Sequence, residues 1–237
     1  MNVGRRKDVG DDVDEVSPEQ AVPAAEDAPE DALDAADDDG SAQWQQWDDA
    51  FSRAEGPFDI TEVDLDADEV TRLDLGTLVI TPFDKMNLQL QVDKSKEKVQ
   101  ALLISDGASA MEVAVFAGPT RTSMLDEIRA EIVNATREAK GMVAMVEGPF
   151  GTELRRRLPV TTPEGKRATH LSRTWLCSGP GWVLRGVVMG KAALEPDNQE
   201  ADAAMWEFFT NTVVRRGPQP AAPGSVLLMD IPALDEK

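Results

Sequence analysis

The chain has 237 residues and a formal net charge of −20. Residues 1–55 hold 17 acidic and 4 basic residues, so most of the excess negative charge lies in the first quarter of the chain. A chain with this charge repels phosphate groups, which disfavours both nucleic acid and anionic membrane surfaces as partners.

Several features of the sequence are those of a cytoplasmic protein. The single cysteine, Cys177, allows no intramolecular disulfide, so nothing requires an oxidising compartment. No stretch approaches the ~20 apolar residues that a membrane span needs. The basic residues at positions 5–7 are followed by acids rather than by an apolar core, which argues against a secretory signal. We therefore expect a cytoplasmic location and no contact with a membrane.

Residues 1–42 are predicted to form a disordered acidic arm. They consist mainly of Asp, Glu, Ala and Pro, so they offer too little apolar surface to offset the entropy lost on ordering. Two roles remain open for this arm. It is either a solvated tail that aids solubility or a segment that docks onto a basic partner.

A short amphipathic helix is predicted over residues 43–55. Trp44, Trp47 and Phe51 lie at positions i, i+3 and i+7, which places three aromatic side chains on one helical face. Two interpretations of this face remain open. Either the helix packs onto the domain that follows, or it is exposed and its aromatic residues bind a groove on a partner protein.

Residues 56–217 have the pattern of one domain. Alternating apolar and polar residues predict strands with turns between them. Strands are expected at residues 86–92, 99–104, 111–116, 142–147, 152–160, 167–177, 181–190 and 213–214. One amphipathic helix is expected at 124–139, where Ser123 and Asp126 have the spacing of a capping box. A second helix is expected to begin with Asp197 as its cap.

The order of these elements indicates the fold class. Strands, a helix, further strands and a second helix follow one another without βαβ alternation. This order indicates an α+β fold with a mainly antiparallel sheet flanked by two main helices. The Pro-rich stretch at 218–223 ends the regular structure, and residues 218–237 are predicted to form an extended tail packed on the domain.

Four blocks of the sequence resemble a known family. In chain order they are FAGPTRTSMLDEIRAEI, GPFGTELRRRLPV, GPGWVLRGVVMGKAA and VVRRGPQPAAPGSVLLMDIP. Over residues 56–234 the chain resembles the actinobacterial domain-of-unknown-function 3710 family. The resemblance implies no assigned activity, and the frequent proximity of the family's genes to a dUTPase gene implies a setting in nucleotide or DNA metabolism. The element order is also similar to that of the PsbP-like α/β/α sandwich, and many proteins of that shape are assembly or binding factors.

No catalytic, cofactor or metal site is expected. The only histidine, His170, and the only cysteine, Cys177, are seven residues apart in one predicted strand, so their side chains point to opposite faces. We interpret His170 as a surface residue and Cys177 as a small core residue. One histidine and one cysteine cannot form a Cys/His metal cluster, and no phosphate-binding or nucleophile motif is present. The sequence therefore favours a non-enzymatic protein.

Arginines form a distinct pattern in this acidic chain. Five of them fall on three strands that are predicted to be neighbours: Arg155, Arg156, Arg157, Arg173 and Arg185. Because the planar guanidinium group bonds carboxylates and phosphates, a shared face of these residues would bind a small anionic ligand or the chain's own acidic arm. The alternative is a set of scattered surface arginines that pair with acids such as Glu153 and Glu164.

Three functions follow, in order of preference. The first is a non-enzymatic binding or assembly module for an unidentified protein partner, which the aromatic helix and the missing catalytic motifs indicate. The second is binding or processing of a small anionic ligand, such as a nucleotide, through the arginine face. The third is nucleic-acid binding through that face, inhibited by the acidic arm.

Overall fold

A computed structural model of the protein describes residues 22–23, 41–92 and 98–231. Most of the predicted acidic arm and the last six residues of the predicted tail lie outside these residues. The described part of the arm before helix α1 is Val22–Pro23 (β1), which pairs antiparallel with β10.

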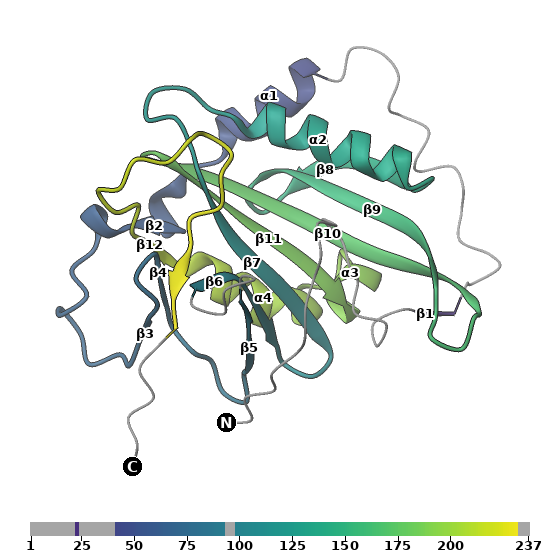
Figure 1. Cartoon of the computed structure of the whole chain (residues 1–237), viewed down its shortest axis with the longest axis horizontal. Coiled ribbons are helices and arrows are strands. Elements are labelled where there is room, and N and C mark those ends of the chain that lie inside the picture. The colour runs from purple at the N-terminus through teal and green to yellow at the C-terminus, as the bar shows by residue number, and fades with distance from the viewer. Residues whose placement is uncertain (1–21, 24–40, 93–97, 232–237) are drawn as a thin grey trace.

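Figure 1 shows the arrangement of the helices and strands. The helices are α1 (Ser41–Ala50), α2 (Leu125–Glu138), α3 (Lys191–Leu194) and α4 (Gln199–Thr210), with 3₁₀ turns η3 (Arg53–Glu55) and η4 (Ile60–Glu62). The remaining strands are β2 (Phe58–Asp59), β3 (Leu73–Asp74), β4 (Leu78–Ile80), β5 (Asn87–Val92), β6 (Lys98–Ser105), β7 (Ser109–Ala117), β8 (Met142–Gly148), β9 (Gly151–Thr161), β10 (Arg167–Gly179), β11 (Trp182–Gly190), β12 (Val213–Val214) and β13 (Met229–Asp230). No described helix has the length and hydropathy of a membrane span.

The main sheet is antiparallel throughout. Its strands follow the order β13-β6-β7-β11-β10-β9-β8, with β5 paired to β6 and β1 paired to β10. A smaller sheet has the order β2-β12-β4-β3 and contains one parallel pair, β2 with β12. The predicted strands that follow residue 86 all form. The predicted α+β class with a mainly antiparallel sheet is therefore confirmed.

Alternation along β10 sends neighbouring side chains into two separate apolar clusters. Trp175 and Cys177 lie in the main core, which also contains Met205 and Phe209 of α4. Leu176, between them in sequence, lies in a smaller cluster that packs against α2. Because successive side chains of a strand point to opposite faces, α2 and α4 cover opposite faces of the sheet. The two flanking helices are thus as predicted.

The C-terminal segment completes the main sheet. Strands β6 and β7 pair only between Leu102 and Ser105 of β6, and the tail pairs with both strands beyond that point. The N–H of Leu227 donates to the carbonyl oxygen of Val115 on β7 at 2.8 Å, and β13 pairs with the first residues of β6. Leu227 and Met229 are buried. Residues 225–230 therefore contribute both backbone pairing and core side chains.

The two main helices begin differently from the sequence prediction. The capping box of Ser123 and Asp126 does not form, because the Asp126 carboxylate accepts from Nη1 of Arg129 instead of reaching back to the backbone. The helix predicted to begin at Asp197 is capped one residue later. The Asn198 side chain accepts hydrogen bonds from two backbone N–H groups in the first turn of α4.

Candidate functional site

Helix α1 lies against the domain. The predicted partner-binding residues Trp44, Trp47 and Phe51 are all half-buried. The ring of Phe51 packs edge-on against Phe150 in the β8–β9 turn, with 5.8 Å between ring centroids. Phe150 in turn lies 4.7 Å from the ring of Phe209 on α4. The helix therefore packs onto the domain, and a role of these three residues in partner binding stays a prediction.

A buried ion pair holds α1 in this position. The Asp48 carboxylate accepts hydrogen bonds from both terminal nitrogens of Arg129, at 2.7 and 2.9 Å, and from the N–H of Thr152 at 2.8 Å. The Thr152 hydroxyl donates to the carbonyl oxygen of Trp44 at 3.1 Å. Arg129 belongs to α2 and is only 2% exposed. Because a buried charge without a partner is costly, the position of Arg129 depends on Asp48.

A glycine in the β8–β9 turn makes room for this contact. Gly151 has φ of 83°, a conformation that L side chains rarely adopt. A Cβ atom at this position would lie 2.6 Å from Oδ1 of Asp48. The missing side chain therefore lets the carboxylate reach the N–H of Thr152, and it couples the turn to the docking of α1.

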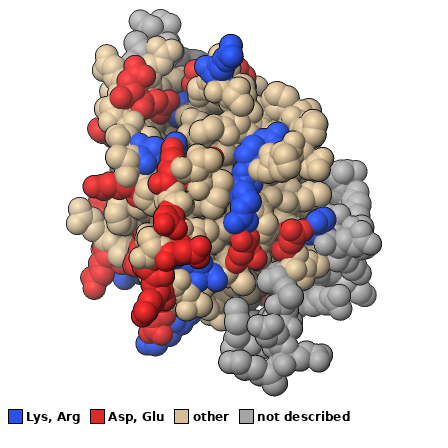
Figure 2. Space-filling view, turned by 90° about the vertical axis from the view of Figure 1, so that its left-hand side faces the viewer, with Lys and Arg blue, Asp and Glu red and all other residues tan. Residues whose placement is uncertain are grey.

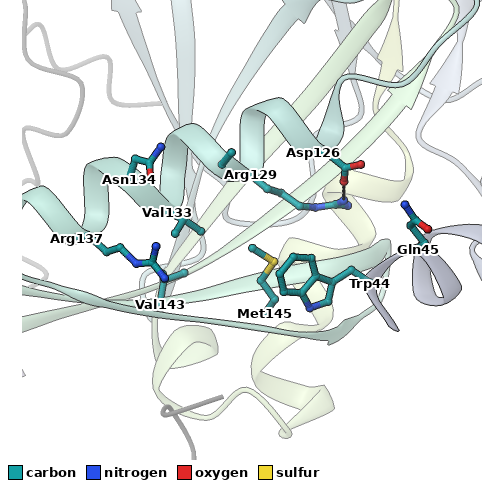
Figure 3. A pocket seen from close by; sticks show the side chains of 10 residues that line it. Trp44, Gln45, Asp126, Arg129, Val133, Asn134, Arg137, Val143 and Met145 are labelled. Atoms are coloured by element: carbon teal, nitrogen blue, oxygen red, sulfur yellow. Dashed lines mark hydrogen bonds and ion pairs between the residues drawn. The ribbon is translucent and has the colours of Figure 1, made fainter. Parts of the chain in front are cut away.

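A groove lies between α2, β8 and the N-terminal half of α1 (Figure 3). Its volume is about 450 Å³. Its apolar lining comes from Val143 and Met145 of β8, Val133 of α2 and Trp44 of α1. Figure 3 shows Trp44 near one end and Arg137 near the other. The remaining lining residues are Gln45, Asp126, Arg129, Ala130 and Asn134.

Two arginines line the groove, and only one of them is without an acidic partner among the described residues. Arg129 also donates to Asp126, at 3.1 Å, and its Nε is buried without a hydrogen-bond partner among the described residues. The Arg137 side chain is exposed and forms no hydrogen bond or ion pair with any residue that the structure describes. The groove therefore combines an apolar lining with a positive charge at one end that is open to a ligand.

The five predicted ligand-binding arginines are divided between the two faces of the sheet. Arg156 and Arg185 point to the α2 side, since Arg156 donates to a threonine hydroxyl of α2 at 2.9 Å and Arg185 pairs in register with a residue of the α2 cluster. Arg155, Arg157 and Arg173 point to the other side. The expectation of one shared arginine face is therefore wrong, because side chains alternate along each strand.

Arg173 is a core residue and not part of an open surface. Its guanidinium donates to both oxygens of Glu153, at 2.9 and 2.8 Å, and to Asp202 of α4, at 2.5 and 2.7 Å. Glu153 is 1% exposed and also accepts from Arg155 at 2.8 Å and from the indole N–H of Trp175 at 2.6 Å. Burial raises the pKa of Asp202 above its usual value, although the hydrogen bond from Arg173 acts in the opposite direction. This network joins β9 and β10 to α4.

The other two arginines are separate from one another. Arg185 donates to Glu112 at 3.2 Å and lies 5.1 Å from the ring centroid of Phe116. Arg157 is half-buried, and its side chain forms no hydrogen bond or ion pair with a described residue. These positions do not converge on one anion site.

His170 and Cys177 lie on opposite faces of β10, as predicted. Cys177 is 1% exposed in the main core, and burial raises the pKa of its thiol to about 12. His170 is 3% exposed, so its interpretation as a surface residue is wrong. The reason is that α2 packs over this face of β10, which alternation along the strand alone does not reveal.

One side of the molecule is acidic. The segment from η4 to β3 carries the exposed side chains Glu62, Asp64, Asp66, Asp68 and Glu69. Figure 2 views the molecule from the side of this segment and shows more acidic than basic side chains over the surface. Within the described ranges, no group of three or more His, Cys, Asp or Glu side chains is arranged to hold a metal ion.

Comparison with protein families assigns most of the chain to a family. Residues 56–237 match the family described as "Protein of unknown function (DUF3710)". The chain belongs to this family. The resemblance of the four sequence blocks is thereby confirmed, and the family description assigns no activity. No curated protein matches the chain.

Solved structures with a related arrangement are remote from this chain. A crystal structure of a protein from Bacteroides thetaiotaomicron VPI-5482 matches with a TM-score of 0.37 and 10% identity, over 64% of this chain and 49% of that chain. This chain thus spans about half of that protein. The solution structure of cyanobacterial PsbP (CyanoP) from Synechocystis sp. PCC 6803 matches with a TM-score of 0.35 and 8% identity, over 61% of this chain and 91% of that chain. The second match is of the PsbP type that the element order suggested. At these scores neither match carries an argument about function.

Sequence reasoning missed the groove and the ion pair beside it. Arg129 lies on the same helical face as Leu125, Ile128 and Ile132, which pack against the α2-side cluster. A charged residue within an apolar helical stripe was the signal that could have revealed a buried ion pair. Its partner Asp48 could not be inferred, because the docking of α1 brings together residues that are 81 positions apart.

Proposed function

We propose that the protein is a non-enzymatic binding module that takes a segment of a partner protein into the groove between α1, α2 and β8. The observation that carries this proposal is the groove itself. It has an apolar lining, and its volume of about 450 Å³ lies within the range of ligand-binding clefts. An apolar surface that remains open on a folded domain commonly marks an interaction site.

The elements that line the groove are already fixed in the protein without a partner. Asp48 and Arg129 fix α1 against α2, and Phe51 and Phe150 fix it against the main core. A site that is already formed avoids much of the entropy cost of ordering on binding. This arrangement supports a role in recognition.

The alternatives based on the arginines receive less support. The arginines that motivated an anion site point to both faces of the sheet, and Arg173 is saturated by Glu153 and Asp202. The acidic surface in Figure 2 disfavours nucleic acid on that side of the molecule. These observations favour the protein-binding module.

A peptide-display experiment tests the proposal. A phage library of random peptides is selected on the immobilised full-length protein, and the selected peptides are measured by fluorescence anisotropy. The variant Ala130→Trp fills the groove from an exposed position of α2 that lines it. The matched control is Ala135→Trp, which lies on the same helix, is exposed and does not line the groove.

We expect A130W to weaken the selected peptides by at least about tenfold, which corresponds to about 1.4 kcal/mol, and A135W to leave their affinity within about twofold. A selection that yields no peptides, or peptides that bind A130W and wild type equally, would contradict the proposal. Matching thermal unfolding curves for the two variants serve as the folding control.

A further inference from the structure

Strand β8 has a free backbone edge beside the groove. It is the last strand of the main sheet and pairs with β9 from Met142 to Gly148. On its other edge, no backbone N–H or carbonyl group of β8 bonds the backbone of another described residue. A row of unpaired backbone groups is a template for the pairing of a further strand.

The sequence of β8 does not protect this edge. Edge strands usually carry lysine, proline or inward-pointing charges that block pairing with another chain. The β8 sequence is MVAMVEG, in which Glu147 is the one charged residue and proline is absent. Met142, at the start of the strand, is 52% exposed. The edge is therefore apolar and open.

The groove runs beside this edge for the length of a short peptide. Val143 and Met145 of β8 point into it, and its lining on α2 extends from Asp126 to Arg137. Those helical residues span about 16 Å, which is the length of about five residues in an extended chain. A strand added to β8 would lie about 4.8 Å away and would direct alternate side chains toward α2. Figure 3 shows the side chains of α2 and β8 that line the groove on this side.

The residues at the two ends of the groove indicate which side chains an added strand would carry. The Arg137 side chain has no partner among the described residues, and the exposed Asn134, three positions earlier on α2, also lines the groove. A guanidinium group and an amide at one end favour a carboxylate there. At the other end, the Trp44 ring forms an apolar wall, and Arg129 is neutralised by Asp48 and Asp126.

We infer that the groove binds an extended peptide segment of a partner protein by adding it as a strand to the free edge of β8. Apolar side chains at alternate positions enter the groove, and a carboxylate of the peptide pairs with Arg137. This inference rests on the proposed function, because it specifies how a partner occupies the same groove. Backbone pairing supplies affinity in this mode, and the alternating pockets supply specificity.

The test uses the selected peptides in modified forms with the full-length protein. Two N-methylated versions of one peptide each block alternate amides, one in each register. Two further versions replace carboxylates by amides. One carries the change at the side-chain carboxylates and the other at the C-terminal carboxylate. Hydrogen exchange of the β8 amides is followed with and without the unmodified peptide.

We expect one N-methylated register to lose at least about tenfold in affinity and the other to stay within about twofold, because only alternate amides face β8. The β8 amides that face the free edge should gain protection from exchange. Removal of the carboxylate, and Arg137→Gln in the protein, should each weaken binding by about threefold to tenfold, and the two changes together should cost no more than either alone.

The outcomes separate the inference from the proposed function. Peptides that are sensitive to A130W but indifferent to both N-methylated registers, without protection of β8, would overturn strand addition and leave the groove as a binding site. Absence of any groove-dependent peptide would overturn both. Sedimentation that shows the free protein pairing with itself through β8 would assign the edge to a second copy and would also overturn the inference.

Discussion

Replacing Asp48 by asparagine tests whether one ion pair holds α1 on the domain. The change keeps the size of the side chain and removes its charge. Arg129, which is 2% exposed, is then left with Asp126 as its acidic partner, and the Asp126 side chain is 72% exposed. Breaking a buried ion pair costs about 3–5 kcal/mol. Because Asp48 is itself 23% exposed and the amide oxygen still accepts a hydrogen bond, we expect a loss of about 2–3 kcal/mol.

The measurement is urea unfolding followed by tryptophan fluorescence, with hydrogen exchange of residues 41–50 as a local readout. Asp49→Asn is the matched control, because Asp49 is exposed and its side chain forms no hydrogen bond or ion pair with a described residue. We expect D49N to change stability by less than about 0.5 kcal/mol. In D48N, faster exchange in α1 should accompany the loss of stability.

A double substitution tests directly whether the two charges depend on one another. Asp48→Leu combined with Arg129→Met removes both charges, so no buried charge is left without a partner. The double variant should be more stable than the sum of the two single effects predicts, by at least about 1 kcal/mol. Equal losses in D48N and D49N, or strict additivity in the double variant, would refute the role assigned to this pair.

Three further predictions follow from the described contacts. Glu153→Gln should cost at least about 3 kcal/mol in urea unfolding, because it removes one of the two acidic partners of the buried Arg173 guanidinium, whereas Glu147→Gln, exposed on the same hairpin, should cost less than about 0.5 kcal/mol. Cys177 should react with iodoacetamide at about pH 8 only after unfolding, since burial raises its thiol pKa, and rapid native labelling would contradict this. The hydrogen bond from Arg53 lowers the pKa of Glu62 below its usual 4.5, so the contribution of the pair is complete above that pH and is lost as pH falls through the lower folded value. The stability difference between Arg53→Met and wild type, measured by urea unfolding, should therefore shrink between about pH 7 and about pH 3, and a difference that stays constant would be inconsistent with this pair.

Local patterns were sufficient for most of the strands and both main helices. Alternation at Leu88 and Leu90 predicted β5, and the glycines at 148 and 151 predicted the β8–β9 turn. These signals depend on residues close in sequence, where backbone geometry and side-chain period act directly. The exact helix starts were less predictable. The Asp126 carboxylate could accept a hydrogen bond from the backbone at the start of the helix or from Arg129, and in the structure it accepts one from Arg129.

The arginine hypothesis failed for a reason that local patterns could have shown in part. Arg155 and Arg156 are adjacent in β9, so they point to opposite faces of the sheet. The burial of Arg173 was different, because its acidic partners Glu153 and Asp202 come from another strand and from α4. A run of charges in a sequence does not distinguish a solvated surface from a paired core.

The sequence by itself determined the kind of protein: an acidic chain with an antiparallel sheet, two main helices and membership in one family, since charge, alternation and short motifs are local properties. Only the tertiary structure decided where α1 lies, which face each arginine takes and that a groove opens beside β8. Each of these depends on contacts such as Asp48 with Arg129, which join distant parts of the chain. Such contacts are selected by packing and by the pairing of buried charges, and neither leaves a pattern in neighbouring residues.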